Sequence, residues 1–236
     1  MTGGSSGIGA ATARRLLREG YRVTVTGRDR DRLARFAVAL DEPAELLTVV
    51  ADAAEYDAVV AAVDTTVGAF GRLDVAIANA GFGTHDTVAD GNPAGWRDMV
   101  LTNVLGPALL IRATVAHPPR ASRGRIILVG SVAGVVHTPG NIYGATKWAV
   151  TGLAENTRRM VTADGVGLTL IAPGVVHTDF WQPASGVPGR PSLTADQIAE
   201  AIAWTVSQPA GVDVNTVTLR PVGQAVRTAP ASLAVR

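Results

Sequence analysis

The chain has 236 residues, of which 47% are apolar and 17% charged, and its 21 basic side chains nearly balance 20 acidic ones. These values are typical of a globular protein and exclude a disordered tail, a fibre and a protein whose main partner is nucleic acid. The absence of cysteine excludes disulfides, thiolate metal sites and cysteine nucleophiles.

Apolar runs typical of strands alternate along the chain with Ala-, Leu- and Arg-rich stretches of helical length. This alternation predicts one α/β domain over residues 1–236, with a doubly wound parallel sheet and helices on both faces. The predicted strands are residues 21–26, 46–50, 73–78, 125–130, 167–171 and 212–219. The predicted helices are residues 10–19, 29–40, 56–70, 96–116, 142–162 and 194–207.

The chain begins with a glycine-rich segment that leads directly into the first predicted helix. Residues 2–9 read Thr-Gly-Gly-Ser-Ser-Gly-Ile-Gly. Gly3, Gly7 and Gly9 would let backbone N–H groups at the helix N-terminus approach a pyrophosphate, whose charge the helix dipole favours. A flexible N-terminal tail is the alternative interpretation.

A basic residue, Arg28, follows the strand predicted over residues 21–26. In a dinucleotide site, an acidic residue here would bind the free 2′-OH of the adenosine ribose, whereas an arginine would pair with a 2′-phosphate. Arg28 therefore favours NADP over NAD. The alternative is that Arg28 and Arg30 only flank the start of a solvated helix, although cations at a helix N-terminus oppose its dipole.

Lysine occurs once in the chain, at position 147, whereas arginine occurs 20 times. Tyr143 precedes Lys147 by four residues, so the two side chains share one face of the helix predicted there. A nearby ammonium favours the phenolate and lowers the pKa of tyrosine from its usual value near 10. The pair therefore predicts a tyrosine that exchanges a proton near neutral pH.

Together with several further segments, these motifs make the chain resemble the short-chain dehydrogenase/reductase family over nearly its whole length. The further segments contain Asp52, Asn79 in Ala-Asn-Ala-Gly, Asn103 in Thr-Asn-Val, Ser131 in Gly-Ser-Val-Ala-Gly and Thr178 in Pro-Gly-Val-Val-His-Thr. The resemblance implies a Rossmann-type domain that binds a nicotinamide cofactor, and Arg28 favours NADP, with NAD less favoured. No metal is expected, because the four histidines show no metal-ligand spacing and have no cysteine partners. The residues expected to contact the cofactor are Gly3, Ser5, Ser6, Gly7, Ile8, Gly9, Arg28, Asp52, Asn79, Ala80, Gly81, Tyr143, Lys147, Pro173, Gly174, Val176 and Thr178.

The resemblance also implies hydride transfer between the nicotinamide and the carbon of a small alcohol or carbonyl compound. Tyr143 would protonate the carbonyl oxygen, Ser131 would orient it, and Lys147 would lower the Tyr143 pKa and bind the nicotinamide ribose. Asn103 would hold a water of the proton relay. Residues 212–224 resemble the branch of the family that oxidises 3-hydroxy acids and related short alcohols. Two alternatives are a non-catalytic NADP-binding protein with a redox-sensing or scaffold role, and an inactive, N-terminally truncated family member.

Residues 179–197 are expected to form a substrate loop or lid, which contains a Pro-, Gly- and Ser-rich stretch. Phe180 and Trp181 would form an apolar wall over the substrate. His85 and His177 flank the expected pocket and are candidates for substrate contact. The other histidines and two helix tryptophans are interpreted as ordinary polar and packing residues: His117, His137, Trp148 and Trp204.

The start of the chain departs from the family pattern. In the expected strand order 3-2-1-4-5-6 the first strand is central, yet Met1 stands where that strand should be ending. Its loss would leave buried backbone groups unpaired on both neighbouring strands, at a cost of about 1–3 kcal/mol each. We expect the natural protein to begin several residues upstream. The alternative is a variant that leaves the strand position empty and binds the cofactor poorly.

The expected partners are a small alcohol or carbonyl substrate and further copies of the chain. Family members form homodimers or homotetramers through two long helices, here residues 96–116 and 142–162. The longest aliphatic run, residues 126–129, is far shorter than the ~20 residues that span a bilayer, and the start lacks the regions of a signal peptide. We therefore expect a cytoplasmic protein with no membrane or nucleic-acid partner.

Overall fold

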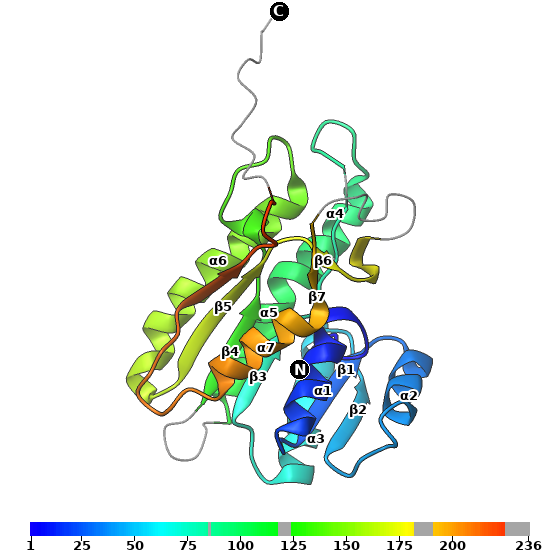
Figure 1. Ribbon diagram of the computed structural model, residues 1–236, viewed down its shortest axis with the longest axis vertical. Helices are drawn as coiled ribbons and strands as arrows, with labels where there is room; N and C mark the ends of the chain where they lie inside the picture. Colours follow the sequence, from blue (N-terminus) through cyan, green and yellow to red (C-terminus); the bar gives the residue numbers. More distant parts are fainter. Residues whose placement is uncertain (85, 118–123, 182–190, 225–236) are drawn as a thin grey trace, which may run out of the picture.

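The computed structural model describes residues 1–84, 86–117, 124–181 and 191–224, except for the side chain of Trp181 (Figure 1). The strands are β1 (Val23–Gly27), β2 (Leu46–Val50), β3 (Val75–Ala78), β4 (Arg125–Val129), β5 (Gly167–Pro173), β6 (Val176–His177), β7 (Leu193–Thr194) and β8 (Thr216–Leu219). The α-helices are α1 (Gly7–Arg18), α2 (Arg30–Val38), α3 (Tyr56–Phe70), α4 (Pro93–Val100), α5 (Gly106–Val115), α6 (Ile142–Val161) and α7 (Ala195–Val206). The six strands expected from the sequence are all present.

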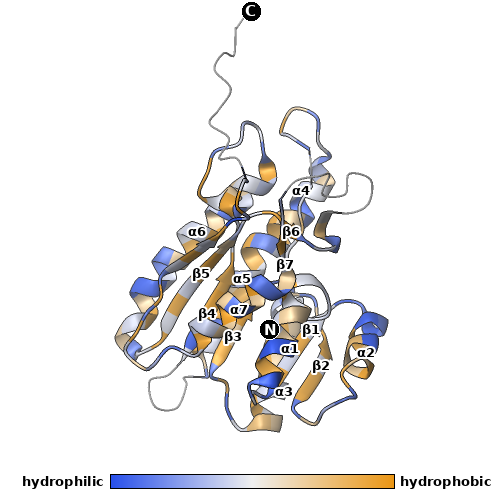
Figure 2. Cartoon of the chain, viewed as in Figure 1, coloured by the Kyte–Doolittle hydropathy of each residue, from blue (hydrophilic) through white to orange (hydrophobic). Residues whose placement is uncertain are grey.

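The strands form a parallel sheet in two parts, with the orders β2-β1 and β3-β4-β5-β8. In Figure 1, α1 and α7 lie in front of the sheet, whereas α3, α5 and α6 lie behind it. Side chains alternate accordingly along β4: Ile127 packs with the cluster under α1, α2 and α7, whereas Ile126 and Leu128 pack with the cluster under α3, α5 and α6. Figure 2 shows the resulting apolar strands between more polar outer helices. The expected doubly wound α/β fold is confirmed.

Met1 and Thr2 lie between the two parts of the sheet, where the central first strand was expected. Thr2 forms a parallel bridge with Thr26, and its N–H donates to the Ile77 carbonyl at 3.0 Å. The Met1 amine donates to the Thr24 carbonyl at 2.8 Å, and the Met1 carbonyl accepts from the Thr26 N–H at 2.9 Å. These two residues therefore join β1 to β3 at one end of the sheet only.

Beyond Met1, a cavity of about 140 Å³ separates the remainder of β1 from β3. Its walls include Val23 and Thr24 on one side, Val75 on the other, and apolar side chains of α1 and α3. The Thr24 hydroxyl is buried without a hydrogen-bond partner. Burial also lowers the pKa of the Met1 amine to about 5. The expected gap in the sheet therefore exists, and it is shorter than a whole strand.

The helix expected over residues 96–116 differs from the expectation, because a π-helical turn, η1 (Leu101–Leu105), separates α4 from α5. By length and composition the rod Pro93–Val115 could cross a membrane, with a mean hydropathy of 1.3. It instead packs in the fold, where α5 lies against α3 and β3. The extra residue of a π turn changes which side chains face the sheet, and such turns occur at functional sites.

Two further expectations are corrected at the other end of the chain. The last strand begins at Thr216 and not at residue 212, because buried Arg125 and Arg158 bind the backbone carbonyls of Val212 and Asn215. Trp204, expected to be a packing residue, is 53% exposed on α7.

Candidate active site

The glycine-rich segment forms a tight loop between Thr2 and α1. Gly3 has a φ of +63°, and a Cβ on Gly9 would lie only 2.1 Å from the Gly3 carbonyl oxygen, so neither position accepts a side chain without strain. The Asn79 side chain, at the end of β3, donates to the carbonyls of Thr2 and Gly3 at 3.1 and 3.0 Å. The loop is therefore fixed at the N-terminus of α1, with room for a phosphate group.

A cavity of about 850 Å³ runs along the carboxyl ends of the strands, where ligands bind in sheets of this type. It brings together nearly all residues that the sequence singled out. Those that line it are Gly3, Ser5, Ser6, Gly7, Ile8, Arg28, Asp52, Asn79, Ala80, Gly81, Ser131, Tyr143, Lys147, Pro173, Gly174, Val176 and Thr178. Gly9 and Asn103 do not line it; Gly9 acts through loop packing and Asn103 through hydrogen bonds.

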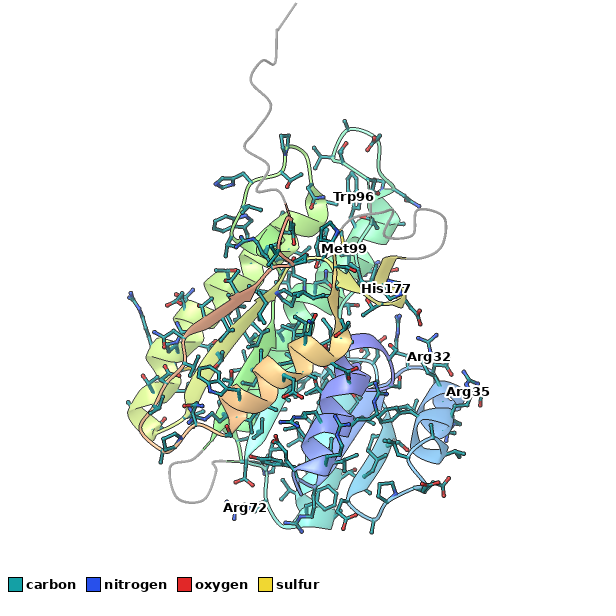
Figure 3. All side chains as sticks on the ribbon, viewed as in Figure 1. Arg32, Arg35, Arg72, Trp96, Met99 and His177 are labelled. Atoms are coloured by element: carbon teal, nitrogen blue, oxygen red, sulfur yellow. The ribbon has the colours of Figure 1, made fainter. Side chains whose placement is uncertain are left out.

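At the end of β1 the cavity is lined by charged side chains. Arg28 is largely exposed, and its guanidinium lies 3.8 Å from the Asp52 carboxylate. Asp29 caps α2 by accepting from the Arg32 N–H at 2.9 Å, so the helix start has an acidic cap and does not depend on Arg28 or Arg30. Arg32 also lines the cavity, projecting from the first turn of α2 (Figure 3). Arg32 was not predicted from the sequence to line the site; Arg28 precedes α2, so no helical spacing relates the two arginines.

Three polar side chains meet at the other end of the cavity. Tyr143 and Lys147 share a face of α6, and the Lys147 ammonium lies 5.7 Å from the centre of the Tyr143 ring. The Lys147 Nζ donates to the Val129 carbonyl at the end of β4, at 3.0 Å. Ser131, in the turn after β4, accepts from the Ala133 N–H at 3.1 Å and lies near enough to Tyr143 to act on its pKa. The short interval between Ser131 and Tyr143 thus still leaves the two side chains beside each other in the cavity.

Burial dominates the ionisation of this group. It raises the pKa of Tyr143 to about 12, although the Ser131 side chain acts in the opposite direction. Burial also lowers the pKa of Lys147 to about 8. The lowered pKa expected for Tyr143 is therefore not found, because the loss of water around the phenol outweighs the favourable contacts. The lysine remains mostly protonated at neutral pH.

Asn103 lies in the π-helical turn and is only 1% exposed. Its Oδ1 accepts from the Phe82 N–H at 3.0 Å, and its Nδ2 donates to the Phe82 carbonyl at 2.8 Å and to the Thr146 hydroxyl at 3.1 Å. Thr146 in turn donates to the Tyr143 carbonyl at 2.7 Å. The Asn103 side chain therefore connects the loop after β3 to the turn of α6 that carries Tyr143, through Thr146, which was not predicted from the sequence.

The segment after β5 closes the cavity at its far side. Thr178 contacts the glycine-rich loop: a Cβ on Gly7 would lie 3.4 Å from its methyl group. Gln224 accepts from the Val175 N–H at 3.1 Å and also lines the cavity. Phe180 packs edge-on against Tyr143, with ring centres 5.6 Å apart. Phe180 is thus placed as an apolar wall beside the candidate acid.

Some expected features fall elsewhere. His177 is exposed on β6 and does not line the cavity. His85, the Trp181 side chain and residues 182–190 of the expected lid lie outside the described residues. Trp148 stacks on His137 on the outer side of α6. Within the described residues, no group of three or more His, Asp or Glu side chains could hold a metal ion.

The fold and the glycine-rich loop define a Rossmann-type, NAD(P)-binding protein.

The family model for short chain dehydrogenases matches residues 1–186. An uncharacterized oxidoreductase of Staphylococcus epidermidis is 33% identical over 94% of this chain and 96% of that protein. Sulfoacetaldehyde reductase 2 of Chromohalobacter salexigens is 34% identical over 95% and 94% of the two chains. The closed form of a serine dehydrogenase complexed with NADP⁺ matches at a TM-score of 0.89 and 28% identity, over 100% of this chain and 97% of the other. The chain belongs to the short-chain dehydrogenase/reductase family and is an oxidoreductase.

Proposed function

We propose that the protein is an NADP-dependent dehydrogenase/reductase that interconverts a small alcohol and its carbonyl compound. The observation that carries this proposal is the group Ser131, Tyr143 and Lys147, which faces one end of a cavity whose other end holds a glycine-rich loop and two arginines. When bound, the nicotinamide supplies a hydride to the carbonyl carbon or accepts one from the alcohol carbon. The remaining chemistry falls to the side chains of this chain.

The role of each side chain follows from its position. In the direction of reduction, Tyr143 donates its phenolic proton to the carbonyl oxygen as that oxygen gains charge, and it takes the proton back in the direction of oxidation. Ser131, which lies beside Tyr143 in the cavity, orients the same oxygen. Lys147, held by the Val129 carbonyl, places a cation beside Tyr143 and the expected position of the nicotinamide ribose. Asn103, which does not line the cavity, keeps Phe82 and α6 in place through its hydrogen bonds to Phe82 and Thr146.

The substrate proposed is a short 3-hydroxy acid or a related small alcohol. Two matched relatives support this class by name, since serine is a 3-hydroxy acid and sulfoacetaldehyde is a small carbonyl compound. Gln224, from the C-terminal segment that resembles the 3-hydroxy acid branch, lines the cavity. The test is turnover with NADPH or NADP⁺ on a panel of short 3-hydroxy acids, matching uncharged alcohols and the corresponding carbonyl compounds. Turnover of none of them would overturn the proposal.

The preference for NADP is proposed to depend on Arg28, supported by Arg32. We expect Arg28→Ala to weaken NADPH binding by about 10- to 100-fold and to leave NADH binding almost unchanged, because a charge-assisted contact with the 2′-phosphate contributes about 1.5–3 kcal/mol. Fluorescence titration with both nucleotides measures the effect. Arg30→Ala is the matched control, since Arg30 is exposed two residues after Arg28, at the start of α2, and does not line the cavity. Equal losses in the two variants would refute a specific role for Arg28.

NADPH binding is also expected to weaken as the pH rises above about 8. Lys147 is protonated below its pKa of about 8 and loses its charge above it. The Met1 amine, which would ordinarily titrate in the same range, has a pKa of about 5 and is neutral throughout. Titrations with NADPH between about pH 6.5 and pH 9.5 measure the dependence. A dissociation constant that stays constant over this range would show that the Lys147 charge does not contribute to binding.

We propose that the protein forms a homodimer or homotetramer and works in the cytoplasm. The two helical segments through which the family assembles carry apolar side chains that are exposed here. These side chains are Val100, Leu105 and Val115 on the α4–α5 rod and Trp148 and Met160 on α6. Such apolar side chains are typical of an interface between subunits.

A further inference from the structure

The loop that follows β3 forms one wall of the cavity directly against Tyr143. A Cβ on Gly83 would lie 3.0 Å from the Cδ2 of Tyr143 and 3.1 Å from the Cζ of Phe180, so the backbone there packs on both rings. Phe82 and Thr84 line the cavity on either side of Gly83. A shift of this loop would therefore change the space available to a substrate beside Tyr143.

The start of this wall is fixed by Asn103, which binds both the N–H and the carbonyl of Phe82. Its end is fixed by Asp86. The Asp86 carboxylate accepts from the Trp96 indole N–H at 3.0 Å and from the Asn92 N–H at 3.3 Å. Trp96 lies on α4, one turn before the buried Met99 (Figure 3). Asp86 thus connects the loop to the helix that leads into the π-helical turn.

The carboxylate is enclosed by its surroundings. A Cβ on Gly91 would lie 2.3 Å from Asp86 Oδ2 and 2.5 Å from the Trp96 ring, so the loop backbone covers this contact. The Thr84 and Trp96 side chains hold the pKa of Asp86 below its usual value, and its Oδ1 is buried without a hydrogen-bond partner. Asp86 stays ionised at neutral pH, so the two hydrogen bonds to its Oδ2 are charge-assisted.

The loop continues from Asp86 to the segment that precedes Tyr143. Thr87 forms an antiparallel bridge with Asn141, and the Val88 N–H donates to the Gly140 carbonyl at 2.9 Å. Asn141 caps α6 by accepting from the Gly144 N–H. A change at Asp86 can therefore reach Tyr143 from two directions, through Gly83 and through the start of α6.

We propose that Asp86 is a positioning residue for the reaction: its carboxylate holds residues 82–84 against Tyr143 and keeps the start of α6 in register. This inference rests on the proposed function, because a positioning role needs a reaction at Tyr143. Asp86 itself touches neither the cofactor nor the reacting atoms. Trp96 is the partner through which Asp86 acts.

The test compares variants of the NADPH-bound protein. Asp86→Ala is expected to raise the KM for the best compound of the panel about tenfold or more while changing the NADPH dissociation constant by less than about twofold. It is also expected to speed amide hydrogen exchange of residues 82–84 and 140–144 about tenfold. Trp96→Phe, which removes the indole N–H together with the five-membered part of the ring, should reproduce both changes. Asp86→Asn, which keeps an acceptor for that N–H, should restore most of the wild-type behaviour.

Asp98→Ala is the matched control, because Asp98 is an exposed acidic residue on α4, the helix that carries Trp96. Wild-type KM and wild-type exchange at residues 140–144 in Asp86→Ala, with only a lower melting temperature, would overturn the inference and leave Asp86 a local structural role. The failure of the proposed function is a different result, namely no turnover by any variant, wild type included. Hydrogen exchange in the NADPH-bound protein still tests Asp86 in that case.

Discussion

Replacing Tyr143 by phenylalanine is expected to reduce turnover by about 10²- to 10⁴-fold, because it removes the hydroxyl proposed to donate the proton to the substrate oxygen. The change removes one hydroxyl from a buried ring that still packs against Phe180. NADPH binding should therefore stay within about twofold of wild type. Steady-state kinetics on the best compound of the panel and a fluorescence titration with NADPH measure the two quantities.

Tyr56→Phe is the matched control, since it removes a hydroxyl from a tyrosine that is exposed at the start of α3. Turnover by Tyr143→Phe at the wild-type rate would exclude Tyr143 as the acid. NADPH binding without turnover in the wild-type protein would instead favour the non-catalytic alternative. The combination of binding and kinetics therefore separates an enzyme from a cofactor-binding protein.

Filling the cavity between β1 and β3 is expected to give the largest change in stability. Four apolar residues placed before Met1 would lie opposite residues 21–24, given the register of Thr2 with Thr26. They would pair with backbone groups of β1 and β3, and their side chains would contact the apolar walls. They would also replace a buried amine, whose pKa of about 5 opposes folding below pH 8, by an amide. A gain of about 3 kcal/mol, or about 10 °C in melting temperature, follows.

A Gly-Ser-Gly-Ser extension of the same length is the control, because it also removes the Met1 amine but offers no apolar side chains. In the unextended protein, stability rises between pH 5 and pH 8 as the Met1 amine loses its proton. Both extensions turn this amine into an amide, so both should abolish that pH dependence. Only the apolar extension should also add the stability that comes from filling the cavity between β1 and β3. Equal melting temperatures for the two extended proteins would show that the cavity does not accept a strand.

The alternation of strands and helices was predicted from the sequence because short runs rich in β-branched and apolar residues alternate with Ala-, Leu- and Arg-rich stretches of helical length. Leu46–Val50 and Tyr56–Phe70 have the predicted bounds for this reason. The π-helical turn at Leu101–Leu105 was not predicted, since its residues have the same local pattern as an ordinary helix. Its formation depends on tertiary contacts, such as those of Asn103 with Phe82 and Thr146.

The site was predictable where a motif holds its residues at fixed spacing, as in the glycine-rich segment and the Tyr143 and Lys147 pair. Arg32, Gln224 and Asp86 were not found. Gln224 and Asp86 act through contacts that folding creates between distant or irregular segments: Gln224 meets Val175 across 49 positions, and Asp86 meets Trp96 across an irregular loop. Arg32 lines the cavity because the fold places the first turn of α2 beside it. The ionisation of Tyr143 could not be predicted from the sequence either, because its raised pKa results from burial in the folded protein.

The scarcity of amines gives this protein an unusual chemical surface. Its chain has two aliphatic amines, the Met1 amine and the Lys147 side chain. The Met1 amine donates a hydrogen bond to the Thr24 carbonyl, and Lys147 is 5% exposed. Reagents that acylate or reductively alkylate amines therefore find almost no target on the folded protein, although arginines are plentiful. Such reagents would modify it mainly after local opening, so the extent of labelling reports how often the sheet centre and α6 open. Immobilisation and fluorescent tagging would have to use other functional groups.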